Sequence, residues 1–142
     1  MKTKIQQAVL GGIVATAVMT MVMFGAPLMG MPKMNPAEML AGMMGLPLFI
    51  GWLMHFMVGV IFALAYVFFF SGILAKISSK IVKGALFGFV VFIFAQVMMA
   101  VMGAILGGMP SPAGSMTLVI LGSMMGHLVY GIVVALFVPN KE

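Results

Sequence analysis

Residues 51–70 read GWLMHFMVGVIFALAYVFFF, an apolar run that contains one histidine, His55, and no charged side chain. A helix needs roughly 20 apolar residues to cross about 30 Å of bilayer hydrocarbon. This stretch is long enough, so it predicts a membrane-spanning helix. An ionisable side chain inside such a helix is costly and usually faces other helices with a polar partner. His55 is therefore the first candidate for a functional residue.

The rest of the chain is equally apolar. Of its 142 residues, 64% are hydrophobic and 6% are charged, whereas a soluble domain carries about a quarter charged residues. Four apolar stretches are long enough to span the membrane, at residues 8–28, 49–73, 82–106 and 116–138. We therefore expect an all-α membrane protein with four transmembrane helices in a single domain, residues 1–142, and no extramembrane domain.

The lysines predict the orientation in the membrane. Most of them precede the first predicted helix, lie between the second and the third or at the start of the third, or follow the fourth: Lys2, Lys4, Lys76, Lys80, Lys83 and Lys141. The other side holds Lys33, close to Glu38. The positive-inside rule then places both termini in the cytoplasm, in the cytoplasmic (inner) membrane of a bacterium or archaeon. This pattern accounts for the net charge of +5, and we expect no nucleic-acid partner.

The two halves of the chain resemble each other when His55 is aligned with His127. The resemblance predicts a duplication, with repeats at residues 1–72 and 73–142. Each repeat would be a hairpin of two helices, so the repeats would keep the same orientation and be related by a pseudo-twofold axis along the membrane normal. The aligned pairs include Gly12 with Gly84, Gly59 with Gly131 and Ala63 with Ala135.

Small residues recur at helical spacing on the same helix faces as the two histidines. In a membrane this spacing lets helix backbones approach closely, so we expect a compact four-helix bundle or two docked hairpins. The glycines expected at these helix contacts are Gly12, Gly51, Gly59, Gly84, Gly88 and Gly131.

The sequence NPAE at residues 35–38 predicts the start of a short helix in the first outer loop. Asn35 would be the N-cap, Pro36 the first helical residue and Glu38 the partner in a capping box. We expect this helix to end near Gly45 and to lie at the outer membrane interface, with its methionines against lipid or against the bundle.

His55 and His127 are candidate ligands of a cofactor. A pseudo-twofold axis along the membrane normal would place them at the same depth, where facing imidazoles could ligate a b-type haem or a metal ion, or contact a quinone. The alternative is that each histidine hydrogen-bonds a neighbouring helix and stabilises the packing. Polar side chains commonly hold membrane helices together in this way, so we expect no cofactor.

Methionine is abundant, with 19 residues in the chain. Apart from Met1, the methionines lie in the outer loops or the outer halves of the predicted helices. Thioethers suit Cu(I), so methionines near the histidines could bind or deliver that ion. The favoured alternative is an adaptable contact surface for another protein. Pairs at helical spacing are Met19 with Met23, Met39 with Met43 and Met98 with Met102.

Catalysis has little support in the sequence. The acidic residues are Glu38 and Glu142, both outside the predicted hydrocarbon region, so there is no carboxylate pair for acid–base chemistry. Cysteine is absent, which excludes a thiol nucleophile and a thiolate metal site. Motifs for phosphate loops, dinucleotides and zinc proteases are also missing. We therefore expect a protein that is not an enzyme.

Four segments resemble a family of small four-helix membrane proteins of unknown function from bacteria and archaea. They are GGIVATAVMTMVM, GWLMHFMVGVIFALAY, KGALFGFVVFIFAQVMM and GHLVYGIVVALF. The resemblance implies an architecture and no activity. The leading interpretation is a non-catalytic accessory or structural subunit, packed among lipids against other subunits of a larger inner-membrane complex such as a respiratory one. The alternatives are a bis-histidine b-type haem protein that transfers electrons and an outward-facing Cu(I)-binding or delivery protein.

Overall fold

The structure, a computed structural model, describes residues 2–108 and 114–138. Lys141, one of the lysines that predict the orientation, and Glu142 lie outside these residues. Within the described ranges, four spans are long and apolar enough to cross a membrane: Thr3–Met29, Leu48–Ile73, Lys80–Leu106 and Met116–Phe137. The predicted all-α class and the four spans are confirmed, and they fit a multi-pass membrane protein.

Each span is built around one long helix. The elements in chain order are α1 (Lys2–Gly25), the short 3-10 helix η1 (Ala26–Met29), α2 (Pro36–Met44), α3 (Leu48–Ala65), the π-helix η2 (Tyr66–Phe70), α4 (Ser71–Ile73), α5 (Lys80–Leu106) and α6 (Met116–Phe137). The second span consists of α3, η2 and α4 in continuous succession.

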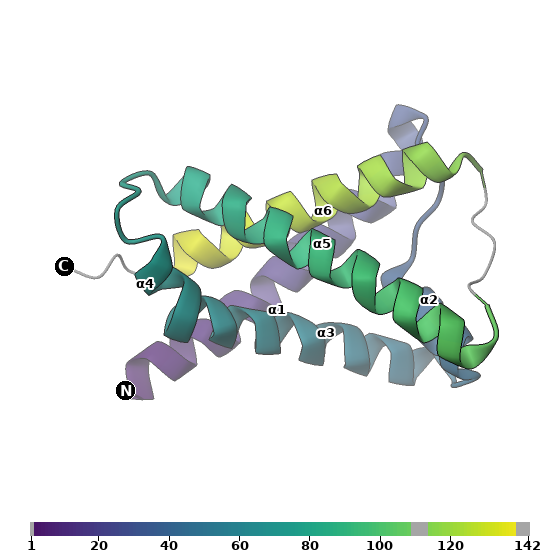
Figure 1. Cartoon of the computed structure of the whole chain (residues 1–142), viewed down its shortest axis with the longest axis horizontal. Coiled ribbons are helices and arrows are strands. Elements are labelled where there is room, and N and C mark those ends of the chain that lie inside the picture. The colour runs from purple at the N-terminus through teal and green to yellow at the C-terminus, as the bar shows by residue number, and fades with distance from the viewer. Residues whose placement is uncertain (1, 109–113, 139–142) are drawn as a thin grey trace.

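The two ends of the molecule differ in chemistry. The start of α1, the end of α6 and the turn from α4 to α5 lie at one end, and α2 lies at the other (Figure 1). We call the first the lysine end, because it carries Lys4, Lys76 and Lys80. We call the end that carries α2 the methionine end.

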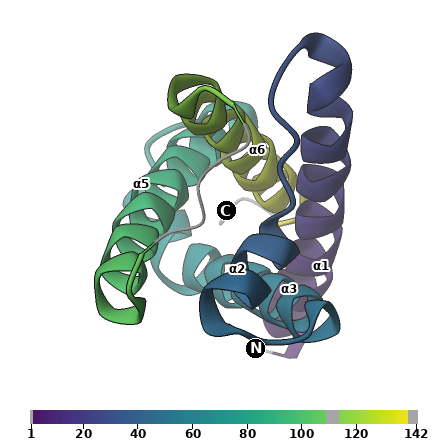
Figure 2. The same ribbon diagram turned by 90° about the vertical axis from the view of Figure 1, so that its right-hand side faces the viewer.

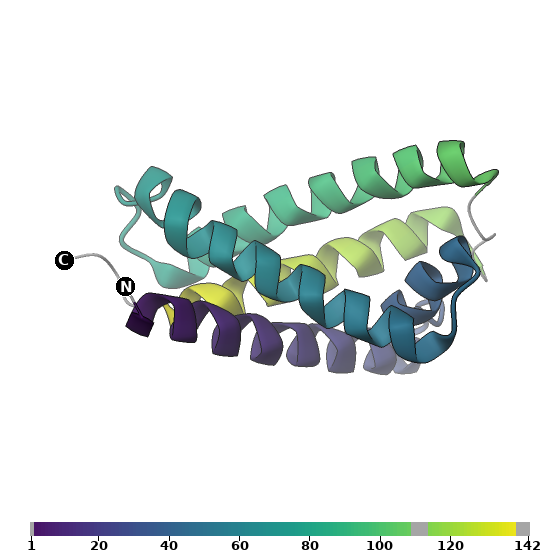
Figure 3. The ribbon, with the colours of Figure 1, turned by 90° about the horizontal axis from the view of Figure 1, so that it is seen from below.

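Helix α1 connects the two hairpins. It packs against α3 on one side and against α6 on the other, and α6 packs in turn against α5. Figure 2, seen from the methionine end, shows the four long helices around the molecular axis with α2 in front of α3. In Figure 3, α3 crosses α1, and α5 diverges from both toward the methionine end. Over the described residues, α3 and α5 therefore do not pack backbone to backbone.

Glycines allow the close approach of α1 and α3. A Cβ atom at Gly12 of α1 would lie 2.8 Å from Val60 Cα of α3. A Cβ atom at Gly59 of α3 would overlap the side chain of Thr16 on α1. The two backbones can pack at this distance only because both positions lack a side chain.

The contact between α5 and α6 follows the same principle. A Cβ atom at Gly84 of α5 would overlap the backbone of Gly131 on α6, and a Cβ atom at Gly131 would overlap Gly84 in return. At Gly88 a Cβ atom would overlap the carbonyl oxygen of His127. This packing fixes the position of His127 directly opposite α5.

Aromatic rings span the distance between α3 and α5 over the half of the molecule nearer the lysine end. The ring centroids of Phe62 and Phe94 are 5.4 Å apart. Phe87 of α5 lies 4.9 Å from Tyr66 and 5.1 Å from Phe70, both in η2. These edge-to-face and tilted contacts close the space between α3 and α5 at this end.

Helix α2 has the N-cap residue and the first helical residue that the sequence predicts. The side chain of Asn35 accepts a hydrogen bond from the backbone N–H of Glu38 at 3.3 Å, and Pro36 is the first helical residue. The helix ends at Gly45, whose φ of 63° is in the left-handed region that favours glycine.

Helix α2 has a defined packing contact with α3. Gly51 of α3 lies against the carbonyl of Ala37, so that a Cβ atom at Gly51 would overlap it. Ala37 and Ala41, which lie against Gly51, are buried. One face of α2 thus packs on the bundle, and Gly51 serves this contact rather than one between long helices.

Candidate functional site

A cavity lies between α3 and α5, with α1 and α6 forming its floor. It has two adjoining parts of about 250 Å³ and about 190 Å³, and nearly all of its wall is apolar. We call it the histidine cavity, because both His55 and His127 line both parts. The residues common to the two parts are Met19, Leu40, His55, Val58, Ala95, Met99 and His127.

His55 lies on α3, where that helix faces α1. Its side chain is 8% exposed, and its Nε2 lies 3.1 Å from Thr20 Oγ1. The Thr20 hydroxyl donates its proton to the carbonyl of Thr16 at 2.8 Å, so its oxygen accepts the N–H of His55 Nε2. A neutral imidazole carries one N–H and one lone pair. For a neutral ring we therefore assign the lone pair of His55 to Nδ1.

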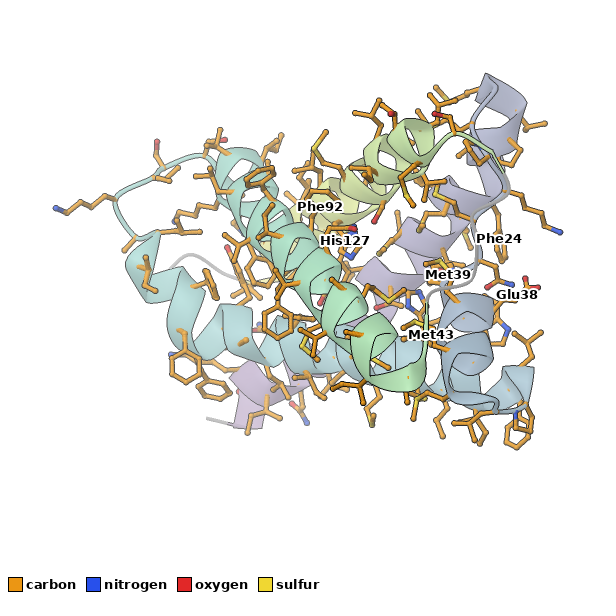
Figure 4. All side chains as sticks on the ribbon, turned by 45° about the vertical axis from the view of Figure 1, so that its right-hand side comes forward. Phe24, Glu38, Met39, Met43, Phe92 and His127 are labelled. Atoms are coloured by element: carbon orange, nitrogen blue, oxygen red, sulfur yellow. The ribbon has the colours of Figure 1, made fainter. Side chains whose placement is uncertain are left out.

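His127 has the opposite arrangement. Its Nδ1 lies 2.7 Å from the carbonyl oxygen of Ser123, one turn earlier on α6. Because a carbonyl can only accept, Nδ1 carries the proton and Nε2 carries the lone pair. The ring lies beside Phe92 of α5, with centroids 6.0 Å apart (Figure 4).

The second nitrogen of each ring takes no part in these hydrogen bonds. Among the described residues, neither His55 Nδ1 nor His127 Nε2 has a hydrogen-bond partner. In that part of the chain, every buried side-chain nitrogen or oxygen does have one, so these two nitrogens must keep accessible surface. Since both residues line the cavity, their lone pairs are available to an occupant.

Other polar side chains on the cavity wall are engaged within the protein. The Thr16 hydroxyl donates to the carbonyl of Gly12 at 2.7 Å, and the Tyr130 hydroxyl donates to the carbonyl of Gly59. The amide of Gln96 on α5 donates to Ser123 Oγ on α6 at 3.2 Å. The cavity thus keeps two imidazole lone pairs and several thioethers as its nitrogen and sulfur electron-pair donors.

The methionines singled out from the sequence do not all reach the cavity. Met43 is buried but does not line it. Met19 and Met99 are the two that line both parts beside the histidines. The methionines lining one part or the other are Met23, Met34, Met39, Met54, Met98, Met102 and Met116.

Carboxylates do not contribute to the cavity. Glu38 is exposed on α2 and points away from His127 (Figure 4). Across residues 2–108 and 114–138, no group of three or more His, Cys, Asp or Glu side chains could hold a metal ion. Any metal bound in the cavity would therefore depend on the two histidines and on sulfur.

A family model described as "Family of unknown function (DUF6789)" matches residues 2–139. The chain belongs to this family. The resemblance predicted from the sequence to a family of unknown function is thereby confirmed. Neither the curated proteins nor the solved structures contain a match to the chain.

Two residues of this DUF6789 protein have contacts that the sequence does not predict. Thr20 orients His55, and Tyr130 joins α6 to α3 through Gly59. Thr20 follows Thr16 at helical spacing on the α1 face that carries Gly12, which is a usable signal for a polar contact between helices. Tyr130 lies one turn beyond Gly126 on α6, and no sequence pattern distinguishes it.

Proposed function

We propose that this protein is a non-catalytic binding protein of the membrane that holds a small ligand in the histidine cavity through the lone pairs of His55 and His127. The proposal rests on one observation: both histidines line the same cavity, and the second ring nitrogen of each is unpartnered. An apolar pocket with a few convergent polar groups is the usual form of a ligand site.

The tautomers limit what the ligand can be. A lone pair accepts a hydrogen bond or coordinates a metal, and it cannot donate. The ligand must therefore bring hydrogen-bond donors, such as hydroxyl groups, or be a metal cation. A molecule that offers only carbonyl oxygens to the histidines, such as an oxidised quinone ring, would leave both nitrogens unsatisfied.

The haem alternative fits this geometry less well. His55 Nε2 is engaged with Thr20, which leaves Nδ1 as the ligating atom. Nδ1 adjoins the Cβ substituent of the imidazole, so a flat macrocycle cannot approach it without steric overlap. A bis-histidine haem would require His55 to break its hydrogen bond and turn its ring.

The accessory-subunit interpretation draws its support from the exposed apolar side chains of all four spans. Those side chains suit lipid as well as they suit a partner protein, because both present an apolar surface to the helices. The histidine cavity is the more specific feature, so we place the ligand-binding role ahead of a purely structural one.

We also propose that the lysine end is cytoplasmic and that the fold arose by duplication of a helical hairpin. Lys4, Lys76 and Lys80 share one end, which supports a cytoplasmic lysine end in an inner membrane. The glycine contacts support a duplication, because Gly12 meets Gly59 between α1 and α3 in the way that Gly84 meets Gly131 between α5 and α6.

The proposal is tested by extracting the full-length protein gently from its native membrane and weighing it by native mass spectrometry. We expect a bound non-lipid mass, lost from the His55→Ala/His127→Ala double variant because both lone pairs are gone. Ala95→Trp should also expel the ligand, since Ala95 lines both parts of the cavity.

The matched control is Val97→Trp, on the same helix at a position 55% exposed. It introduces the same side chain on the lipid-facing surface, so the bound mass should be retained. Wild-type protein that carries no such mass, or a mass that survives in the double-histidine variant, would contradict a ligand site at these histidines.

A further inference from the structure

The geometry points to Cu(I) as the ligand of the histidine cavity, held between His55 and His127 and completed by the sulfur atoms of Met19 and Met99. This inference rests on the proposed function, because it names the occupant of the same cavity. The two residues beyond the histidines are Met19 and Met99, and the ion is bound by two nitrogen and two sulfur atoms.

Each of the four long helices contributes one donor to this set. Met19 lies on α1, His55 on α3, Met99 on α5 and His127 on α6. These four are the residues with nitrogen or sulfur donors that line both parts of the cavity. A metal ion bound by one residue from each helix would link α3 to α5 across the cavity, and both of them to α1 and α6.

The donor types match Cu(I) better than other common ions. Thioether sulfur is a soft ligand that selects Cu(I), and imidazole also suits copper. Structural zinc sites instead rely on thiolates, imidazoles and carboxylates, and the chain has no cysteine. Calcium and magnesium need oxygen ligands, which the cavity does not provide in sufficient number.

The lack of negative charge in the cavity also favours a monovalent ion. Placing an ion in an apolar cavity is costly unless opposite charge compensates it. The residues that line the histidine cavity include no carboxylate, so a divalent ion would keep its full charge there. Cu(I) brings a single positive charge and can be bound by neutral donors.

The hydrogen bonds behind the histidines are of the kind found at metal sites. A metal-ligating histidine almost always donates its other N–H to a carbonyl, a carboxylate or water, which fixes the ring and raises its basicity. His127 donates to the Ser123 carbonyl, which is one of these partners. His55 donates to the Thr20 hydroxyl, whose oxygen accepts as that of water does. In each ring this leaves a lone pair with a fixed direction.

The inference is tested by titrating the full-length protein, solubilised in detergent, with Cu(I) under anaerobic reducing conditions against a chromophoric Cu(I) chelator. We expect a single Cu(I) per chain, with both nitrogen and sulfur neighbours in its X-ray absorption spectrum. His55→Ala and His127→Ala should each weaken binding by about tenfold or more, by comparison with the loss seen when supporting residues of metal sites are removed.

Replacement of methionine by leucine separates the loss of sulfur from the loss of packing, because the two side chains have similar volume. Met19→Leu and Met99→Leu should each weaken binding and remove sulfur from the X-ray absorption signal. The controls Met21→Leu and Met29→Leu should bind as the wild type does, since these side chains are 71% and 74% exposed.

The outcomes separate this inference from the proposed function. Cu(I) binding that is unchanged in the double-histidine variant, or that lacks sulfur neighbours, overturns the assigned site. If Cu(I) does not bind but the native protein carries an organic mass that depends on both histidines, the copper inference fails and the proposed function stands. If neither is found, both fail.

Discussion

The Thr20 hydroxyl and the Ser123 carbonyl hold the two histidine rings in different tautomers. The first contact joins α1 to α3 and the second lies within α6, and together they decide which nitrogen of each ring remains available. Inside a bilayer, an unpaired N–H on an imidazole would cost free energy because no water is present to satisfy it. Each of these hydrogen bonds therefore contributes to stability while it sets the direction of a lone pair.

The variant Thr20→Val tests this contact. It keeps the shape of the side chain but removes the oxygen that accepts the His55 N–H. The free energy of unfolding should fall by about 0.6 kcal/mol, the average for polar contacts between membrane helices, and by no more than about 1.7 kcal/mol, the largest such value. The measurement is unfolding in mixed micelles with a denaturing detergent. In the control Thr117→Val, the residue is exposed at the start of α6, and a change within about 0.5 kcal/mol is expected. Equal stabilities for the two variants would mean that Thr20 does not hold His55.

The packing of the helices depends on where two backbones come into contact. The pairs α1–α3 and α5–α6 meet at glycines, and their closest points involve residues without side chains. Helix α3 and helix α5 have no such contact and meet through aromatic rings instead. The histidine cavity exists because of this difference in how the neighbouring helices pack.

Gly84→Ala tests the packing of α5 on α6. The added methyl group would overlap the backbone of Gly131, and such overpacking typically costs about 1–3 kcal/mol. The matched control is Gly25→Ala, where a Cβ atom would have no neighbour within 4 Å. That variant should be as stable as the wild type or gain up to about 1 kcal/mol from helix propensity. The same micelle unfolding assay compares them, and a harmless Gly84→Ala would argue against this helix contact.

The positions of the elements could be predicted from the sequence, because length and hydropathy alone decide which segments cross a bilayer. The cap at Asn35 was equally predictable, since its side chain acts on its own helix. The rotation of each helix about its own axis could not be predicted. On α5, Phe92 is 5% exposed and Phe94 is 51% exposed, yet the two residues are identical in type. Lipid and protein interior are both apolar, so hydrophobicity cannot tell which of them faces the bundle.

The candidate site was predictable only in part. The two histidines stand out in so apolar a sequence, and the alignment of the two halves pairs them. Their common cavity depends on the space between α3 and α5, which arises from packing between segments far apart in the chain. Thr20 and Tyr130 could not be assigned to their partners for the same reason, since each bond joins two different spans.

At the scale of the whole molecule, charge is separated along the axis of the bundle. Lysines gather at the end where α1 begins and α6 ends, and α2 covers part of the opposite end (Figure 1). Because the positive-inside rule acts on short loops near the membrane, this separation predicts a single orientation. The methionine end, with most of the cavity methionines near it, would then face outward.

The absence of cysteine makes the orientation simple to measure. Ser78→Cys introduces an exposed thiol between α4 and α5, and Met44→Cys introduces one at the end of α2. On intact cells, a membrane-impermeant thiol reagent should label the cysteine at position 44 and leave the one at position 78 unlabelled until the membrane is permeabilised. The reverse pattern would place the lysine end outside.

The central claim is that the histidine cavity presents one unprotonated nitrogen from each of two neutral rings. The most direct measurement is the ¹⁵N NMR spectrum of the protein labelled at histidine, recorded near neutral pH, because the chain has only 2 histidines. We predict two neutral rings of opposite tautomer, one protonated at Nε2 and unprotonated at Nδ1, and the other the reverse. Two rings of the same tautomer, or two charged rings, would contradict it.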